Sequence, residues 1–348
     1  MSAIGTKSPS HSIPHPIPVK QARSILASTA VETLQAIASD SKMRMEGYPK
    51  NYELLGSGIF RPDEYYKALK EMHQSDRIEY FVKKGSFVHG YVSTKHFKMI
   101  PQTQSDLYPT GFSKHCFVLK EGIEPTEALA ALGGTIALLR CGETCQISYY
   151  RAINHLLGDA KFNMLFAANS LTPLKLGQSC ENPINYLITA TPAGGRMTKG
   201  NVRQIDNASI YNIKHVTGEA AVLTTLCCDD TPGKERFTTL GIDPQGLTHA
   251  EVDEALMAEF NKDSISIASV TDTVARHLFM GRYDELLPIH KHYANRQISS
   301  IAEFKQSEGG KVIMNGELKV AFITTLANSS LKDSRLLFDS FFKRVRVS

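Results

Sequence analysis

The segment Leu139–Asn163 reads LRCGETCQISYYRAINHLLGDAKFN, and it decides how the chain is interpreted. Its apolar residues recur at the spacing of one buried helical face, namely Ile147, Tyr150, Ala152, Ile153, Leu156 and Leu157. Gln146 and Arg151 fall outside this face, and Gly158 is a typical helix end. The pattern predicts an amphipathic helix with Cys141 in its first turn.

Cys141 is the candidate nucleophile of the chain. Unpaired backbone N–H groups and the positive end of the helix macrodipole favour a thiolate at this position. Arg140 precedes the cysteine and is expected to stabilise the anion further. An average cysteine is more often a small buried apolar residue, and we expect this packing role for Cys145, one turn deeper on the same helix face.

The same segment resembles the active-site helix of the small bacterial spore-coat transglutaminases (protein-glutamine gamma-glutamyltransferases). In that family the nucleophilic cysteine is followed eight and nine residues later by two tyrosines, and then by G-[DE]-x-K-F-N. The matching residues here are Cys141, Tyr149, Tyr150, Gly158, Asp159, Lys161, Phe162 and Asn163. The resemblance runs from about Glu79 to Leu287. It implies an α+β fold with a papain-like (NlpC/P60-like) core, in which an antiparallel sheet packs on the helix of the nucleophile.

Two residues are candidates for the partner of the cysteine. The string GNVRQIDNASIYNIKHVTGEAAVLTTL, residues 200–226, resembles two strands of the family, and Glu219 stands where the family pairs a carboxylate with its cysteine. Histidine holds this position in the wider group of papain-like enzymes. His215 lies four residues earlier, about 13 Å away if both residues lie on one strand, so only one of the two can meet Cys141. We rank Glu219 first and His215 second.

The chain departs from the family in three ways. Arg140 replaces a carboxylate that precedes the nucleophile in the family. The family places tryptophans around its acyl-donor tunnel, whereas this chain has no Trp and has Val216 at one such position. A histidine that follows the second strand is replaced by a turn expected at Phe237-Thr238-Thr239. The substrate channel and the third catalytic member therefore differ from the family pattern.

The resemblance implies thiol acyl transfer on a protein glutamine, without a cofactor. A lysine amine would then give a cross-link, and water would give deamidation. Two alternatives stay open. One is a papain-like cysteine peptidase or amidase that uses a Cys141–His215 pair, and the other is a non-catalytic binding module on the same fold. In the enzyme interpretations the partner is a protein substrate.

Composition limits the other classes of function. The net charge of +4, from 39 basic and 35 acidic residues, gives no reason to expect nucleic acid. No run approaches the roughly 20 apolar residues of a membrane helix, and we expect no membrane partner. The six cysteines form no C-x-x-C pair, and Cys227 and Cys228 would point to opposite faces of a strand, so we expect no metal site. A cytoplasmic location, or export by a route without a Sec signal peptide, is expected.

Four regions are expected along the chain: a mobile leader at 1–20, an N-terminal helical region at 21–78, the catalytic domain at 79–288 and a C-terminal extension at 289–348. Helices are predicted at 21–41, 63–72, 249–261 and 267–279, and strands at 202–205, 220–226 and 236–240. Residues 77–100 read as a hairpin with its loop at 83–86. In the extension, Asn315-Gly316 predicts a second hairpin, followed by a helix at 334–344.

Overall fold

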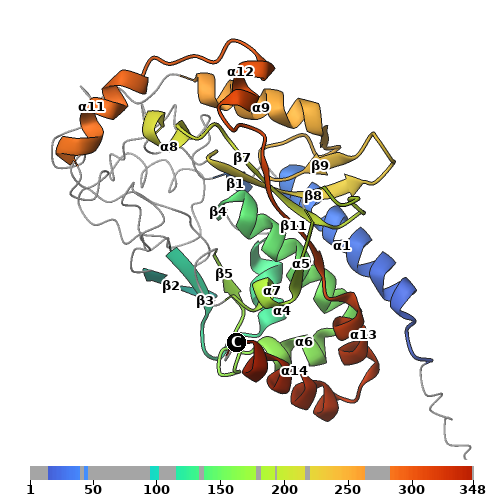
Figure 1. Cartoon of the computed structure of the whole chain (residues 1–348). Coiled ribbons are helices and arrows are strands. Elements are labelled where there is room, and N and C mark those ends of the chain that lie inside the picture. Colours follow the sequence, from blue (N-terminus) through green and yellow to red (C-terminus); the bar gives the residue numbers. More distant parts are fainter. Residues whose placement is uncertain are drawn as a thin grey trace, which may run out of the picture.

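The computed structural model describes residues 15–39, 43–45, 95–101, 115–132, 137–177, 182–192, 194–215, 220–262 and 283–346. Several predictions lie outside the described residues: most of the leader, the helix at 63–72, most of the hairpin at 77–100, the helix at 267–279, and the positions of Val216 and Glu219. Figure 1 shows the arrangement of the described elements.

The described helices are α1 Val19–Ser39, α4 Pro125–Leu132, α5 Cys141–Leu157, α6 Asp159–Phe166, α7 Pro183–Tyr186, α8 Tyr211–Lys214, α9 His249–Asn261, α11 Tyr283–Tyr293, α12 Ile301–Gln306, α13 Val320–Asn328 and α14 Leu331–Val345. The described strands are β1 Met43–Met45, β2 Phe97–Pro101, β3 His115–Leu119, β4 Ala137–Leu139, β5 Lys175–Leu176, β6 Ile188–Thr191, β7 Val202–Asp206, β8 Val222–Asp229, β9 Arg236–Thr238, β10 Leu247–Thr248 and β11 Val312–Leu318.

The predicted α+β class is confirmed. Six strands form one sheet in the order β10-β9-β8-β7-β11-β6, and every neighbouring pair in it is antiparallel. Helix α5 packs against β8, and α1 packs along α5 (Figure 1). The helix that begins at Cys141 therefore lies on an antiparallel sheet, as expected for a papain-like core.

Helix α5 is more buried than its apolar pattern predicts. Every residue from Cys141 to Tyr150 is buried, including Gln146, which the pattern placed outside the buried face. The Gln146 amide exchanges two hydrogen bonds with the backbone of Gly177, at 3.1 and 2.9 Å. The Tyr149 hydroxyl donates to the carbonyl of Gly200 at 2.8 Å. The expectation of one buried face is wrong here because these polar groups find partners inside the core.

Basic side chains cap the carboxyl ends of other helices. Unpaired carbonyls and the negative end of the macrodipole favour a cation at such an end. The donor and acceptor pairs are Arg151 to Leu129, Lys161 to Leu326, Lys214 to Phe260, and Arg335 to Met164. Lys161 belongs to the motif that follows Gly158, and its contact shows that part of this motif holds helices α6 and α13 together.

Residues 312–318 form one strand and no hairpin. Strand β11 passes straight through Asn315 and Gly316 and pairs with β6 on one side and β7 on the other. Asn315 is buried, and its side chain accepts a hydrogen bond from Arg203 Nε at 3.0 Å. A Cβ on Gly316 would stand 2.6 Å from Ile188, so glycine serves a close approach between strands. The predicted turn is wrong because Asn315 is held by a hydrogen bond inside the sheet, and Gly316 is needed where two strands come close together.

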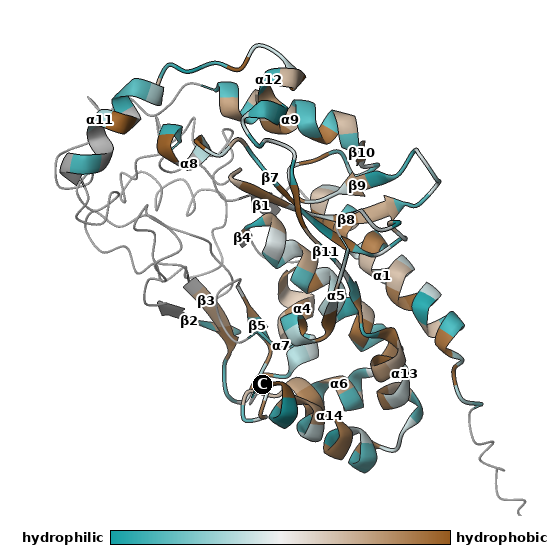
Figure 2. Cartoon of the chain, in the orientation of Figure 1, coloured by the Kyte–Doolittle hydropathy of each residue, from teal (hydrophilic) through white to brown (hydrophobic). Residues whose placement is uncertain are grey.

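The helices after β11 complete the lower layer in Figure 1. Figure 2 shows hydrophilic and hydrophobic residues alternating along α14, whose Phe338 and Phe342 are buried. Residues of the predicted C-terminal extension thus provide a strand of the main sheet, β11, together with helix α13, which packs on α1 and α5, and helix α14, which packs on α6. Among the described helices, none combines the length and the apolar character needed to cross a bilayer.

Candidate active site around Cys141

Helix α5 begins at Cys141, directly after β4, as the sequence predicted. Arg140 is its N-cap residue and has an extended backbone conformation. The Arg140 backbone N–H donates to Oε2 of Glu143 at 2.6 Å. Glu143 is only 2% exposed. A buried carboxylate therefore lies in the first turn of α5, although the residue before the cysteine is basic.

Part of the β8 strand directs toward this end of α5 backbone groups that pair with no described strand. Cys227 makes both of its backbone hydrogen bonds on the β7 side, donating to Asn201 at 2.9 Å and accepting from Gly200 at 2.8 Å. Because backbone groups alternate in direction along an antiparallel strand, those of residues 222, 224 and 226 point toward the β9 side. Strand β9 ends at Thr238, which pairs with Leu226. The groups of residues 222 and 224 therefore lie beyond the end of β9.

Two cysteines of α5 take up these backbone groups. The N–H of Thr224 donates to Sγ of Cys141 at 3.3 Å. The Cys141 thiol donates to the carbonyl of Val222 at 3.6 Å, and the Cys145 thiol donates to the carbonyl of Thr224 at 3.7 Å. The two thiols, one helical turn apart, thus bond to backbone groups of β8 that lie beyond the end of β9. These contacts hold α5 against the edge of β8.

Burial controls the protonation of Cys141. The side chain is 3% exposed, and burial raises the pKa of its thiol above the ordinary value, with a smaller contribution from the Glu143 carboxylate. Hydrogen bonds from Thr224 and from the Gly142 backbone lower the pKa but do not offset burial. The expectation that the helix terminus and Arg140 hold Cys141 as a thiolate is therefore wrong. The resting residue is a neutral thiol.

Of the two candidate bases, the structure describes His215 but not Glu219. His215 follows α8, and its Nε2 lies 2.8 Å from the carbonyl oxygen of Phe260 near the end of α9. Lys214 donates to the same oxygen at 2.7 Å, and the ring of Tyr211 stacks on His215 with centroids 4.8 Å apart. Within the described part of the chain, no hydrogen bond joins His215 to Cys141. Glu219 lies outside the described residues.

The segment expected as a turn at Phe237-Thr238-Thr239 is different in the structure. Strand β9 continues to Thr238, and the turn follows it. Thr239 is fully buried, but its hydroxyl has no hydrogen-bond partner among the described residues, and burial raises the pKa of the Cys145 thiol well above the ordinary value. Thr239, at the start of this turn, is therefore part of the buried core near Cys145.

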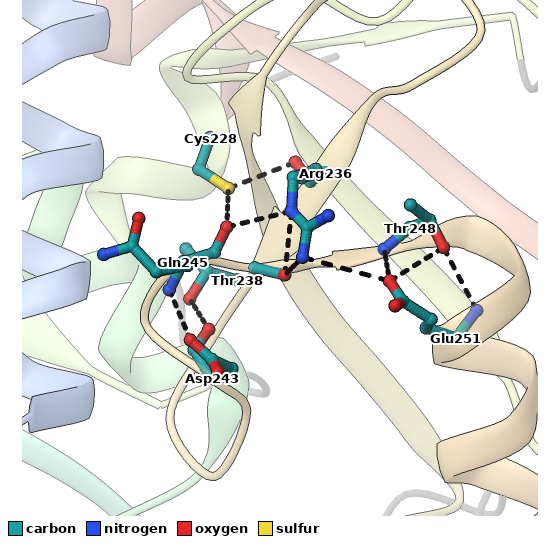
Figure 3. Close-up of polar contacts among 8 residues, drawn as sticks. Cys228, Arg236, Thr238, Asp243, Gln245, Thr248 and Glu251 are labelled. Atoms are coloured by element: carbon teal, nitrogen blue, oxygen red, sulfur yellow. Dashed lines mark hydrogen bonds and ion pairs between the residues drawn. The ribbon is translucent and has the colours of Figure 1, made fainter.

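Polar contacts hold the turn in place (Figure 3). Arg236 donates to the carbonyls of Gln245 and Gly246 at 3.2 and 3.0 Å. Thr238 donates to the carbonyl of Asp243 at 3.2 Å. These contacts tie β9 to the segment that leads into β10.

The sequence pattern predicts no contact of Val222 or Thr224 with the cysteines. A period-two pattern in residues 220–226 could have shown which backbone groups share an edge of the strand. It could not have shown that β9 is too short to cover that edge, because this depends on pairing between strands.

No family model matches the sequence, and no curated protein matches it. The solved structures include a similar chain, the transglutaminase from Geobacillus stearothermophilus (without C-terminal extension). The match has 12% sequence identity and a TM-score of 0.48, and it covers 88% of this chain and 96% of that one. Similarity at this level does not assign a reaction or a residue's role to this chain.

Proposed function

We propose that the chain is a thiol acyltransferase that acts on glutamine side chains of proteins, with Cys141 as nucleophile and Glu219 as its base. The observation that carries the proposal is the position of the Cys141 sulfur. It lies at the first residue of a helix, against an open strand edge, with a backbone N–H directed at it. Nucleophilic catalysis by cysteine requires a thiol held at such a junction, with a base nearby.

The neutral state of Cys141 makes a base necessary. Because burial raises the pKa of the thiol, its proton has to be removed as the sulfur attacks. In the proposed reaction Sγ attacks the carboxamide carbon of glutamine, and the proton passes through the base to the leaving ammonia. The thioester then reacts with a lysine amine, which forms an isopeptide bond, or with water, which forms glutamate. In either step the amine or the water gives up a proton, which the base passes to the leaving Cys141 sulfur.

The choice of Glu219 as the base rests on the resemblance to the transglutaminases, in which a carboxylate at this position is paired with the cysteine. The ring of His215 is instead fastened to the Phe260 carbonyl, beside the Lys214 ammonium, which suits a residue that holds α8 to α9. We therefore keep Glu219 first and His215 second.

Amine incorporation tests the proposal. The protein is incubated with casein as glutamine donor and a labelled primary amine, and both incorporated label and released ammonia are measured. We expect wild type and Cys116→Ala to be active and Cys141→Ala to be inactive. Cys116 is a matched control because it is equally buried but lies on β3. A well-folded wild type that incorporates no label and releases no ammonia contradicts the proposal.

A cysteine peptidase or amidase is the second candidate. It is supported by the absence of tryptophan, which the related transglutaminases place around their acyl-donor tunnel, and by Arg140 in place of a carboxylate. The products separate the two functions. Mass spectra that show backbone cleavage, without the one-unit increase of glutamine deamidation, would select this candidate.

A further inference from the structure

Cys145 is a buried nucleophilic group that the proposed reaction does not use. It is 2% exposed, and its thiol donates to the Thr224 carbonyl at 3.7 Å. Burial raises its pKa well above the ordinary value, and a negative charge on Cys141 opposes its ionisation further. Cys145 therefore stays a neutral hydrogen-bond donor during the reaction.

Both thiols contact the same residue of β8. The N–H of Thr224 is bonded to Cys141, and its C=O is bonded to Cys145. These two groups point to the same edge of the strand, where β9 no longer runs. The two thiols, one helical turn apart on α5, bond to both backbone groups of one strand residue. The Cys145 contact thus limits how Thr224 can shift along the helix.

We propose that Cys145 is a positioning residue for the nucleophile: by holding the Thr224 carbonyl, its thiol keeps the Thr224 N–H on the Cys141 sulfur, where that N–H stabilises the thiolate as it forms. This inference rests on the proposed function in taking Cys141 as the reacting group. It adds a role for a second cysteine that never bonds to the substrate.

The hydrogen bond from Thr224 to Cys141 matters most when the Cys141 thiol loses its proton. In the resting state the Cys141 thiol donates to Val222, and that hydrogen bond is lost when the proton leaves. The N–H of Thr224 then becomes the donor to an anion, and hydrogen bonds to ions are about twice as strong as neutral ones. A displacement of Thr224 therefore affects the anionic sulfur more than the neutral one.

The test measures alkylation of Cys141 by iodoacetamide, followed by peptide mass spectrometry from pH 6 to pH 10. The full chain is used as wild type, Cys145→Ala, Cys145→Ser and Cys227→Ala. Cys227 is a matched control because it is a fully buried thiol on β8 itself and bonds to Asp229. Circular dichroism at each pH confirms that the compared variants are folded.

We expect Cys145→Ala to shift the pH profile of Cys141 alkylation to higher pH, with a rate at pH 8 lower by roughly two- to tenfold, the range for loss of one hydrogen bond. Cys145→Ser keeps a hydroxyl donor and should return the profile to that of wild type. Cys227→Ala should leave it unchanged. An unshifted profile in Cys145→Ala overturns the inference, and so does an equal shift in the Ala and Ser variants.

The outcome is separate from that of the proposed function, because alkylation needs no glutamine substrate. A shifted profile in a protein that incorporates no amine would keep the positioning role and reject the acyltransferase. An unshifted profile in a protein that incorporates amine would do the reverse.

Discussion

The backbone N–H of Thr224 donates to Sγ of Cys141, with 3.3 Å between the two atoms, although the residues are 83 positions apart in the sequence. The contact exists because β9 ends at Thr238 and leaves the edge of β8 open at this point. A feature of strand pairing thus supplies the candidate nucleophile with a hydrogen-bond donor. The reactivity of Cys141 is therefore tied to the position of the sheet under α5.

The first prediction concerns the intrinsic reactivity of wild-type Cys141. Because burial raises the pKa of its thiol, the thiolate fraction at neutral pH should be small and should grow throughout the range up to the ordinary value of 9.0. We expect the alkylation rate to rise roughly tenfold per pH unit between pH 6 and pH 8. Quenched iodoacetamide reactions with peptide mass spectrometry measure this rate. A plateau reached below pH 7 would indicate a preformed thiolate.

The second prediction compares the candidate bases. Glu219→Gln keeps the size and most of the hydrogen-bonding capacity of the side chain but removes the base, so turnover should fall by roughly 10²-fold or more. His215→Gln should lower turnover far less. Glutamine is chosen for both because its amide N–H can still donate to the Phe260 carbonyl that His215 contacts. Initial rates of amine incorporation are the measurement.

The reverse result has a clear meaning. If His215→Gln abolishes turnover in a protein of wild-type thermal stability, while Glu219→Gln retains it, the carboxylate carried over from the transglutaminases is not the base. The chain would then work as a Cys-His enzyme.

Local signals in the sequence are sufficient for the boundaries of α5 and α9. The start of α5 at Cys141 and its end before Gly158 follow from periodicity and a glycine with φ of 78°. Helix α9 spans the predicted residues 249–261, because Thr248 and Glu251 cap it with contacts three residues apart. These interactions are local, so the sequence alone specifies them.

Non-local contacts account for what the sequence missed. The pattern treated Gln146 as a residue outside the buried face, whereas its partner Gly177 lies 31 residues away and makes burial possible. The helix terminus and Arg140, which the sequence shows, predict a lowered pKa for Cys141. Burial raises this pKa instead, and the burial comes from elements that are distant in the sequence. An Asn-Gly pair predicts a turn when only its neighbours in the sequence are considered. The hydrogen bond that keeps Asn315 inside the sheet comes from Arg203, which is 112 residues away.

The third prediction concerns a glycine beside an ion pair whose carboxylate is buried and whose lysine is exposed. Gly310 has φ of 71°, and a Cβ there would overlap Asp253 and Lys305, whose carboxylate and ammonium lie 2.6 Å apart. Gly310→Ala should therefore separate a pair whose carboxylate is only 5% exposed. Gly233→Ala is the matched control, because Gly233 has φ of 74° and no atom within 4 Å of the added Cβ.

The two variants share the cost of a left-handed backbone, about 1–2 kcal/mol. We expect Gly310→Ala to lose more stability than Gly233→Ala, because the methyl group would displace the buried Asp253 carboxylate from its partner. Urea unfolding followed by circular dichroism measures both free energies of unfolding. Equal losses would show that the surroundings of Gly310 can move to accept a methyl group.

The last prediction concerns stability at alkaline pH. Burial raises the pKa of Cys227 from 9.0 to about 12, and the neighbouring Cys228 adds to this effect. Between these two values the folded chain retains a proton that the unfolded chain has lost. The folded state therefore binds more protons, and the free energy of unfolding should fall as pH rises through this window. The contribution of Cys227 between pH 9 and pH 10.5 is at most about 2 kcal/mol.

In Cys227→Ala the free energy of unfolding, measured in urea, should decline less steeply from pH 9 to pH 10.5 than in wild type. Thr225→Ala removes another fully buried side chain of β8 that does not titrate, so it should be less stable at every pH and keep the wild-type slope. Identical slopes in wild type and Cys227→Ala would show that this thiol ionises equally in the folded and unfolded chains.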